Sequence, residues 1–332
     1  MATLLAGDVG GTKTLLGLFD STHSPPLRLK VSRFSTLDFS GLPAMIEKFL
    51  SGHLGGVESA CLGVAGPVQH NVSNLTNIPW RVDAKDISVT FSIPCVRLLN
   101  DATAAAYAIP QLSGPQLEFL QIGHRDLQGN AALIASGTGL GESILQNIDG
   151  TLIPTPSEGG HADFAARTTR EQKLVDTLTQ SHGRVSCEEI LSGSGLVHFH
   201  RFVHGSENCT GLPSGVPISE QPFCITKAGI RKDCDGCTET VNLFVEALGS
   251  EAGNLGLRSM ATAGVYVGGG IPPQILPALR NPLFLQAFTS KFPMSNLLKK
   301  IPVAVILDTE APLIGAAIAA QTLHAQPSGR SS

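Results

Sequence analysis

The chain has 332 residues, of which 42% are hydrophobic and 15% are charged, a balance that is typical of a compact soluble protein. This length exceeds what one hydrophobic core usually organises, so we expect two domains. The formal net charge of −4 and the lack of a Lys/Arg-rich run argue against a nucleic-acid groove. No apolar stretch reaches membrane-spanning length, and the first residues lack a signal-peptide pattern. We expect a cytoplasmic protein without nucleic-acid or membrane partners.

The first glycine-rich stretch, "LLAGDVGGTKT" (4–14), is close to a phosphate-binding P-loop. It departs from the pattern G-x-x-x-x-G-K-[ST] because Thr12 stands where a glycine should precede the lysine. A P-loop also leads into a helix, whereas residues 13–19 form only a short run of large apolar residues. We therefore expect strands at 3–9 and 13–19 joined by a tight glycine turn, and a third strand at 27–34.

This turn is a candidate phosphate site. Gly10 and Gly11 are expected to adopt backbone dihedrals that are closed to residues with a Cβ. Their amides and the Thr12 hydroxyl can surround phosphate oxygens, and Asp8 stands at the strand end, where a carboxylate can face Mg²⁺. The alternative is a structural hairpin that binds nothing, because a short glycine motif alone is weak evidence.

A helix is expected at 101–109, where Asp101 suits the first turn, alanines favour the interior and Pro110 follows the end. A last helix at 311–323 is expected to return to the first half of the chain. The remaining expected elements are helices at 41–52, 168–182, 193–204 and 238–262, strands at 59–68 and 94–100, an irregular Gly/Ser/Pro-rich segment at 204–222 and a disordered tail from Gln326.

The opening pattern recurs later in the chain. "AALIASGTGLGESIL" (131–145) again joins two apolar runs through glycines, as in residues 4–18, and "VYVGGGIPP" (265–273) echoes "CLGVAGPV" (61–68). Two such units about one domain length apart indicate duplicated halves. Two opposed glycine hairpins can hold a polyphosphate from both sides, which favours phosphate binding over a purely structural hairpin.

Six motifs in order resemble those of the bacterial-type ATP-dependent glucokinases, members of the sugar kinase/heat-shock ATPase/actin superfamily. They are "GDVGGTKT", "LLNDATAAAYAIP", "ASGTGLGES", "SEGGHADF", "SCEEILSGSGL" and "VGGGI". The resemblance implies an α/β fold of two duplicated actin-like ATPase (ribonuclease H-like) domains around a central cleft. A small domain would comprise 1–110 plus 311–332, and a large domain 111–310. It also implies a homodimer that acts in glycolysis.

The resemblance further implies phosphorylation of glucose at its 6-hydroxyl by ATP and Mg²⁺. Asp101 would be the catalytic base, and Asp8 would lie near the metal, through water. The ATP-binding residues would be Gly10, Gly11 and Thr12 in the first turn, Gly137, Thr138 and Gly139 in the second, and Gly268, Gly269 and Gly270 near the adenosine. The glucose-binding residues would be Asn100, Asp101, Glu158, His161 and Glu188.

The residue types suit this chemistry independently of the family. Phosphorylating a hydroxyl needs a positioned carboxylate to accept its proton, and Asp101 stands where a strand meets a helix. The alternative for Asp101 is a helix N-cap. Asn100, Glu158 and Glu188 are the kind of side chain that makes paired hydrogen bonds to neighbouring sugar hydroxyls.

His161 has a second interpretation. In the related repressor-and-kinase (ROK) sugar kinases, a histidine in a similar motif binds zinc together with a C-x-C-G-x-x-G-C segment close behind. No such segment follows here, so we expect no zinc at His161. The pair in "CDGC" (234–237) lies far downstream without an evident second pair of ligands, and the seven scattered cysteines are expected to be free thiols.

Two other functions remain open at this stage. The same carboxylates can hold another hexose, such as mannose or fructose. A sugar-sensing regulator on a kinase scaffold is the non-enzymatic alternative, although only seven residues precede Asp8, which leaves little room for an N-terminal DNA-binding domain. A nucleotide-switch chaperone or filament protein is disfavoured, because such proteins have no sugar for Glu158 or Glu188 to bind.

Overall fold

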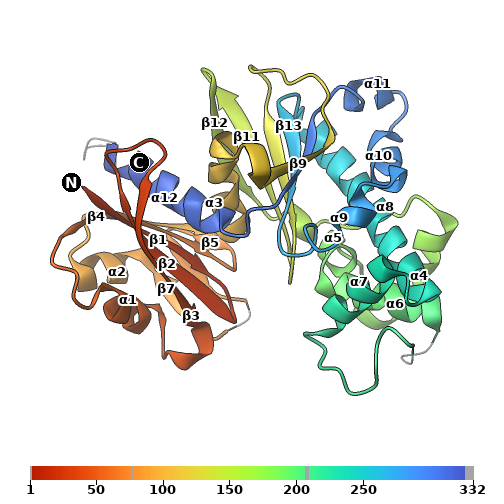
Figure 1. Cartoon of the computed structure of the whole chain (residues 1–332), viewed down its shortest axis with the longest axis horizontal. Helices are drawn as coiled ribbons and strands as arrows, with labels where there is room; N and C mark the ends of the chain where they lie inside the picture. The colour runs from red at the N-terminus through yellow and green to blue at the C-terminus, as the bar shows by residue number, and fades with distance from the viewer. Residues whose placement is uncertain (1, 77, 206–208, 326–332) are drawn as a thin grey trace. The chain divides into compact units, whose positions relative to one another are not determined.

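The computed structural model describes residues 2–76, 78–205 and 209–325. The chain divides into two compact units, Met1–Ser113 with Glu310–Ser332 (unit 1) and Gly114–Thr309 (unit 2) (Figure 1). Both units are mixed α/β, as the sequence predicts. Within the described residues, no helix combines the length and the apolarity that crossing a membrane requires. The tail predicted to be disordered from Gln326 lies outside the described residues.

Unit 1 is built on a five-stranded sheet of order β3-β2-β1-β4-β8. The first three strands form the antiparallel meander that the sequence predicts, and the last two run parallel to β1. Their bounds are β1 (Thr3–Val9), β2 (Lys13–Asp20), β3 (Leu27–Ser35), β4 (Val57–Val64) and β8 (Cys95–Asn100). Because β1, β4 and β8 are parallel, their carboxyl ends lie at one edge of the sheet, where Asp8 is opposite Gly63 and Val64 is opposite Asn100.

The other elements of unit 1 surround this sheet (Figure 1). They are the helices α1 (Leu42–Leu50), α2 (Ala84–Phe91), α3 (Asp101–Ala108) and α12 (Ala311–Ala325), the short 3₁₀ helices Thr36–Asp38 and Ile109–Gln111, and a small sheet of β5 (Val68–Gln69), β6 (Val72–Asn74) and β7 (Arg81–Asp83).

The last helix, α12, belongs to unit 1 although it ends the described chain. It packs on the alanine-rich α3, and the two helices approach so closely that a Cβ on Gly315 would lie 1.8 Å from the carbonyl oxygen of Ala104. The Ser59 hydroxyl of β4 donates to the carbonyl of Ala320 at 2.7 Å. The close packing of small residues on both helices therefore fixes the position of α3, and of Asp101 at its first residue, relative to the sheet.

Unit 2 contains a six-stranded sheet of order β12-β11-β10-β13-β14-β9. Its first five strands repeat the order and directions of the unit 1 sheet: β10, β11 and β12 form an antiparallel meander, and β13 and β14 continue in parallel from β10. The bounds are β9 (Leu117–Gln121), β10 (Ala131–Ser136), β11 (Leu140–Ile148), β12 (Thr151–Ser157), β13 (Gly264–Gly268) and β14 (Val303–Ile306).

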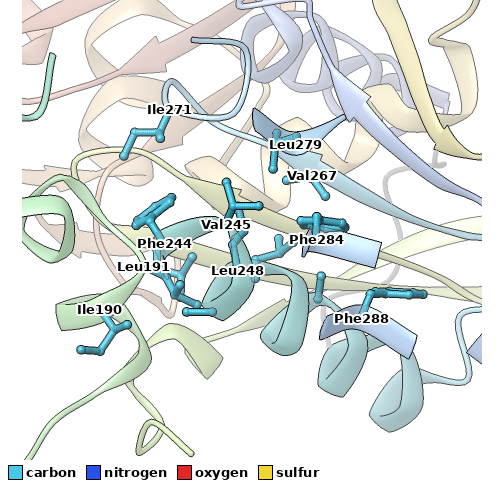
Figure 2. Close-up of a cluster of buried hydrophobic side chains, with 14 of the residues drawn as sticks. Ile190, Leu191, Phe244, Val245, Leu248, Val267, Ile271, Leu279, Phe284 and Phe288 are labelled. Atoms are coloured by element: carbon cyan, nitrogen blue, oxygen red, sulfur yellow. The ribbon is translucent and has the colours of Figure 1, made fainter. Parts of the chain in front are cut away.

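The largest core of the chain lies in unit 2, where α8 packs against the sheet and against α10. Figure 2 shows Phe244 and Leu248 of α8 among Phe284, Phe288 and Val267. The helices of this unit are α4 (Thr169–His182), α5 (Cys187–Ile190), α6 (Gly193–His204), α7 (Gln221–Arg231), α8 (Asp235–Ser259), α9 (Leu276–Leu279), α10 (Pro282–Thr289) and α11 (Ser295–Leu298), with 3₁₀ helices at Gly114–Gln116 and Gly159–His161.

Several elements of unit 2 are absent from the sequence prediction. Strand β12 contains Pro154 and Pro156, which normally argue against a strand, and it is tolerated because it is an edge strand of the sheet. Helix α7 has a proline in its first turn, where the missing N–H costs nothing. The helix predicted at 238–262 begins one turn earlier and ends three residues sooner, as α8.

Candidate active site

The first glycine hairpin of unit 1 joins β1 to β2. The Gly10 amide donates to the Lys13 carbonyl at 3.1 Å, and a Cβ on Gly10 would lie 2.8 Å from that oxygen. The expectation that Gly10 needs a dihedral closed to other residues is wrong, because its φ lies outside the left-handed region. Glycine is required here by the close approach of the backbone instead.

Thr36, which follows β3, braces this hairpin. Its hydroxyl donates to the Gly10 carbonyl at 2.8 Å, and its amide donates to the Thr12 carbonyl at 2.9 Å. Within the described residues, the amides of Gly11 and Thr12 donate no hydrogen bond. Thr36 thus binds the carbonyls of the turn, while the amides of the turn remain available to an anion. Sequence reasoning missed Thr36, since only the pairing of β3 with β2 brings it there.

Asp8 and Asp101 lie at the same sheet edge of unit 1: Asp8 is at the carboxyl end of β1, and Asp101 comes just after the carboxyl end of β8. Gly63, on the strand between them, admits the start of α3: a Cβ there would lie 2.8 Å from the Ala104 Cβ. Burial, followed by the negative charge of Asp101, raises the pKa of Asp8 to about 6, while the Lys13 ammonium acts in the opposite direction. A partly buried carboxyl close enough to a second carboxyl to feel its charge is an oxygen-donor environment that suits a hard divalent cation such as Mg²⁺.

Asn100 is the N-cap of α3. Its side-chain oxygen accepts from the Ala102 amide at 3.0 Å, and its Nδ2 lies 3.4 Å from the Gly66 carbonyl. Asp101 is therefore the first helical residue and not the N-cap residue, although its Oδ1 also accepts from Ala102 N at 2.8 Å. Both predicted residues are oriented by the same helix start.

The second glycine hairpin joins β10 to β11 in unit 2. The Gly137 amide donates to the Gly139 carbonyl at 2.8 Å, and the Gly137 carbonyl accepts from the amide of Gly193, at the start of α6, at 2.9 Å. In the part of the chain that the structure describes, the Thr138 and Gly139 amides make no donation. The hairpin thus repeats the arrangement of the first one, with braced carbonyls and available amides.

The predicted adenosine-binding glycines follow β13, which pairs in parallel with β10, so that Gly268 is opposite Ala135. Gly269 has φ +91°, and a Cβ there would lie 2.2 Å from the Ser136 carbonyl oxygen, so only glycine fits. At Gly270, by contrast, no atom lies within 4 Å of an added Cβ. The two predicted nucleotide segments of unit 2 are therefore neighbours at one sheet edge.

Three of the predicted sugar-binding residues gather beside this hairpin in unit 2. His161 has one ring nitrogen 3.9 Å from Glu158 Oε2 and the other 4.0 Å from Glu188 Oε1. The Glu188 Oε2 accepts from the Leu140 amide at 2.9 Å, and a Cβ on Gly139 would lie 2.5 Å from that same oxygen. The structure thus joins the predicted sugar-binding group directly to the predicted phosphate hairpin.

A buried ionisable group that the sequence analysis missed lies beneath the 158–161 turn. Glu142 of β11 is only 2% exposed, and a Cβ on Gly159 would lie 2.2 Å from its Oε2. Burial, and then the nearby Glu251 carboxylate, raise the pKa of Glu142 to about 7, while the Arg258 guanidinium opposes this shift. Its Oε1 has no hydrogen-bond partner within the described residues. Only strand pairing and the packing of α8 could have identified this group.

Chemically, unit 1 offers hairpin amides and two carboxyls, and unit 2 offers hairpin amides, a glycine loop and a carboxylate–imidazole group. Such amides bind phosphate oxygens, and such carboxylates bind hydroxyls or accept their protons. The predicted site residues of each unit are brought together within that unit.

Comparison with known proteins identifies the family. The Glucokinase family model matches residues 5–323. The chain is 36% identical to a glucokinase from Trichormus variabilis over 97% of this chain and 100% of that protein, and 33% identical to a glucokinase from Yersinia enterocolitica over 94% of each chain. Among solved structures, it matches a glucokinase from an Antarctic psychrotroph with a TM-score of 0.82 and 31% identity, over 97% of this chain and 99% of that one. The chain therefore belongs to the Glucokinase family.

Proposed function

We propose that this protein transfers the γ-phosphoryl group of ATP to the 6-hydroxyl of D-glucose, giving glucose 6-phosphate and ADP. The observation that carries the proposal is the hydrogen bond from Leu140, at the end of the second glycine hairpin, to Glu188. It links a phosphate-binding turn to a group of sugar-binding type. Membership of the Glucokinase family supports the same assignment.

The fold comparison supports the wider placement. A ROK family glucokinase from Streptomyces griseus, solved with glucose and AMPPNP, shares the fold at a TM-score of 0.65 and 22% identity. We infer that the two units are duplicated actin-like domains of the sugar kinase/heat-shock ATPase/actin superfamily. The repeated strand order of the two sheets supports this inference. In this assignment the small domain is 1–110 plus 311–332, and the large domain is 111–310.

The proposed reaction is a single displacement. The glucose 6-oxygen attacks the γ-phosphorus of ATP, the bond to the β,γ-bridging oxygen breaks, and ADP leaves with that electron pair. Asp101 accepts the proton of the 6-hydroxyl as the new bond forms. The carboxylate needs to be ionised and oriented for this role, and its position at the start of α3 provides the orientation.

The other residues bind and position the two substrates. Asn100, Glu158, His161 and Glu188 hold the glucose hydroxyls together with Asp101. The turns Gly10–Gly11–Thr12 and Gly137–Thr138–Gly139 hold phosphate oxygens through their amides, and Gly268, Gly269 and Gly270 lie along the adenosine. A Mg²⁺ ion held near Asp8 through water would neutralise charge on the transferred phosphoryl group.

A kinase assay with a hexose panel tests this proposal. Purified protein with Mg-ATP should phosphorylate glucose with a higher kcat/KM than mannose or fructose, and ³¹P–¹H correlation spectra should place the phosphate on carbon 6. Preference for mannose or fructose would favour the alternative hexose kinase. Sugar binding without any phosphorylated product would favour a sugar-sensing regulator on a kinase scaffold and would overturn the enzymatic assignment.

Three further expectations accompany the assignment. We propose that the protein is a homodimer, that it is cytoplasmic and that it supplies glucose 6-phosphate to glycolysis. Light scattering of the purified chain and fractionation of the source cells test the first two directly.

A further inference from the structure

Two histidines and two cysteines come together in unit 2 at the C-terminal end of α6. His200 and His204 lie one turn apart on that helix, Cys209 follows it, and Cys237 lies in the first turn of α8. One nitrogen or sulfur atom of each residue lies within 4.8 Å of those of the other three. The expectation that the pair in 234–237 has no second pair of ligands nearby is therefore wrong, because α6 packs beside the start of α8.

The separations are close to those of a tetrahedral zinc site. Zinc binds sulfur at about 2.3 Å and nitrogen at about 2.0–2.1 Å, so tetrahedral ligand atoms lie about 3.3–3.8 Å from one another. Here the Sγ atoms of Cys209 and Cys237 are 3.7 Å apart, within this range, and Nε2 of His200 lies 3.1 Å from the Cys209 sulfur, slightly below it. Both cysteines are free thiols.

One ring nitrogen of His200 has no partner among the described residues. The residue is fully buried, at 0% exposure, and its Nδ1 makes no hydrogen bond within the described residues. Its ring also lies close to that of His204, with centroids 4.3 Å apart. The other His200 nitrogen, Nε2, contacts the Cys209 sulfur, so two adjacent imidazoles and two thiols bring four metal-binding side chains together in one place.

The backbone around the cluster favours thiolate sulfur and leaves space for it. The Leu212 amide donates to the Cys209 sulfur at 3.1 Å, and an N–H directed at sulfur stabilises the ionised form that binds metals. A Cβ on Gly211 would lie 2.9 Å from the Cys237 sulfur, and one on Gly236 would lie 2.5 Å from the His204 Nε2. Glycine at both positions therefore allows the ligands to converge.

We propose that His200, His204, Cys209 and Cys237 bind one structural zinc ion. Two nitrogens and two sulfurs in a tetrahedral arrangement select zinc among the common divalent ions. Two Zn–S bonds form as two thiol protons are released to solvent, while the neutral imidazoles donate their lone pairs. Four protein ligands leave no open position for a substrate, so the ion has no part in catalysis. The fifth candidate, Cys234, lies with its sulfur 3.8 Å from the His204 Nε2 and outside the four.

The site would link the end of α6 and the turn at 209–212 that follows it to the start of α8, about 25 residues further along the chain. The other end of α6 begins at Gly193, whose amide binds the carbonyl of Gly137 in the second glycine hairpin. The ion would thus fix the helix that supports the hairpin. This inference does not depend on the proposed function, because it rests on residues outside the candidate active site.

Metal analysis of the untagged full chain, purified under reducing conditions without chelator, tests the proposal. We expect about one zinc ion per chain. The double variant Cys209→Ser/Cys237→Ser should lose the zinc. Two matched variants should keep it: Cys224→Ser, a half-buried cysteine of the adjacent α7, and His161→Ala. Zinc retained by the double variant would contradict the assignment, and zinc lost with His161→Ala would move the site to the sugar-binding group.

A second measurement covers the case in which the double variant does not fold. Wild-type chain stripped with chelator and reloaded with Co²⁺ should show the intense visible absorption of tetrahedral cobalt and a near-ultraviolet band from thiolate-to-cobalt charge transfer. A wild-type protein that contains no zinc and gives neither band would overturn the proposal. An intact mass two hydrogens lower, with the bond mapped to Cys209 and Cys237, would show a disulfide instead and would also overturn it.

Discussion

The buried carboxyl of Glu142 makes the stability of unit 2 depend on pH. Its pKa is about 7 in the folded chain, against an ordinary value of 4.5. Between these values the unfolded chain ionises the group while the folded chain keeps it protonated, so folding stability falls as pH rises from about 4.5 to about 7. The full gap corresponds to about 3 kcal/mol. The groups that face the carboxyl are Glu251 and Arg258 of α8 and Cys187 of α5.

Glu142→Gln removes this titration while keeping the shape of the side chain. At pH 5 the wild-type group is still largely protonated, so the variant differs little in charge from the wild type. At pH 8 the wild type has to ionise a buried group and the variant does not. The difference in unfolding free energy, variant minus wild type, should therefore increase by roughly 2–3 kcal/mol between pH 5 and pH 8. In a unit of roughly 200 residues this is a relative gain of about 5–10 °C in Tm.

Scanning calorimetry at the two pH values measures this difference. The single tryptophan, Trp80, lies in unit 1, so the transition that is silent in tryptophan fluorescence belongs to unit 2. Glu171→Gln is the matched control: Glu171 is equally buried, but it accepts from the Arg167 and Thr168 amides at 2.6 and 3.1 Å. Its replacement should destabilise the unit by about 1 kcal/mol at pH 8. A Glu142→Gln effect that is the same at pH 5 and pH 8 would refute the reasoning.

Two other substitutions test the site. Gly269→Ala should destabilise unit 2 by about 1–3 kcal/mol and raise the KM for ATP, because the new Cβ meets the Ser136 carbonyl. The control Gly270→Ala has open space around its Cβ and should change neither the stability nor the KM. Equal effects of the two substitutions would contradict the steric argument. Glu188→Gln should raise the KM for glucose about 10-fold or more, because it loses charge-assisted hydrogen bonds, while kcat changes less; an unchanged KM would remove Glu188 from the sugar site.

The parts of the fold that local pattern determines were predictable. The strand–glycine–strand repeats at 4–18 and 131–145 correspond to two hairpins with the same position in their sheets. Alternation, glycine placement and proline stops are short-range signals, and they also located α3 and Asp101. Strands β9 and β14 were not predicted, because their short segments carry no pattern that separates them from loop or helix.

The parts of the site that depend on tertiary contact were not predictable. Thr36, Glu142 and the cluster of His200, His204, Cys209 and Cys237 each act on residues far away in the sequence. The sequence "GLGESIL" does not indicate whether its glutamate is buried or exposed, and only the packing of α8 shows that it is buried. The spacing of His200 and His204 at i and i+4 on one helix is a local signal that could have indicated the metal cluster.

The most direct test of the account is the turnover of Asp101→Asn. Asparagine keeps the size of the side chain and an oxygen that can accept from Ala102, but it cannot take up the proton of the glucose 6-hydroxyl. General-base catalysis contributes about 10²–10⁴-fold, so kcat should fall by about 100-fold or more. The Kd for glucose, measured by calorimetry, should stay nearly unchanged. A variant that retains more than about a tenth of the wild-type kcat would show that Asp101 is a sugar ligand or a helix-start residue and not the base.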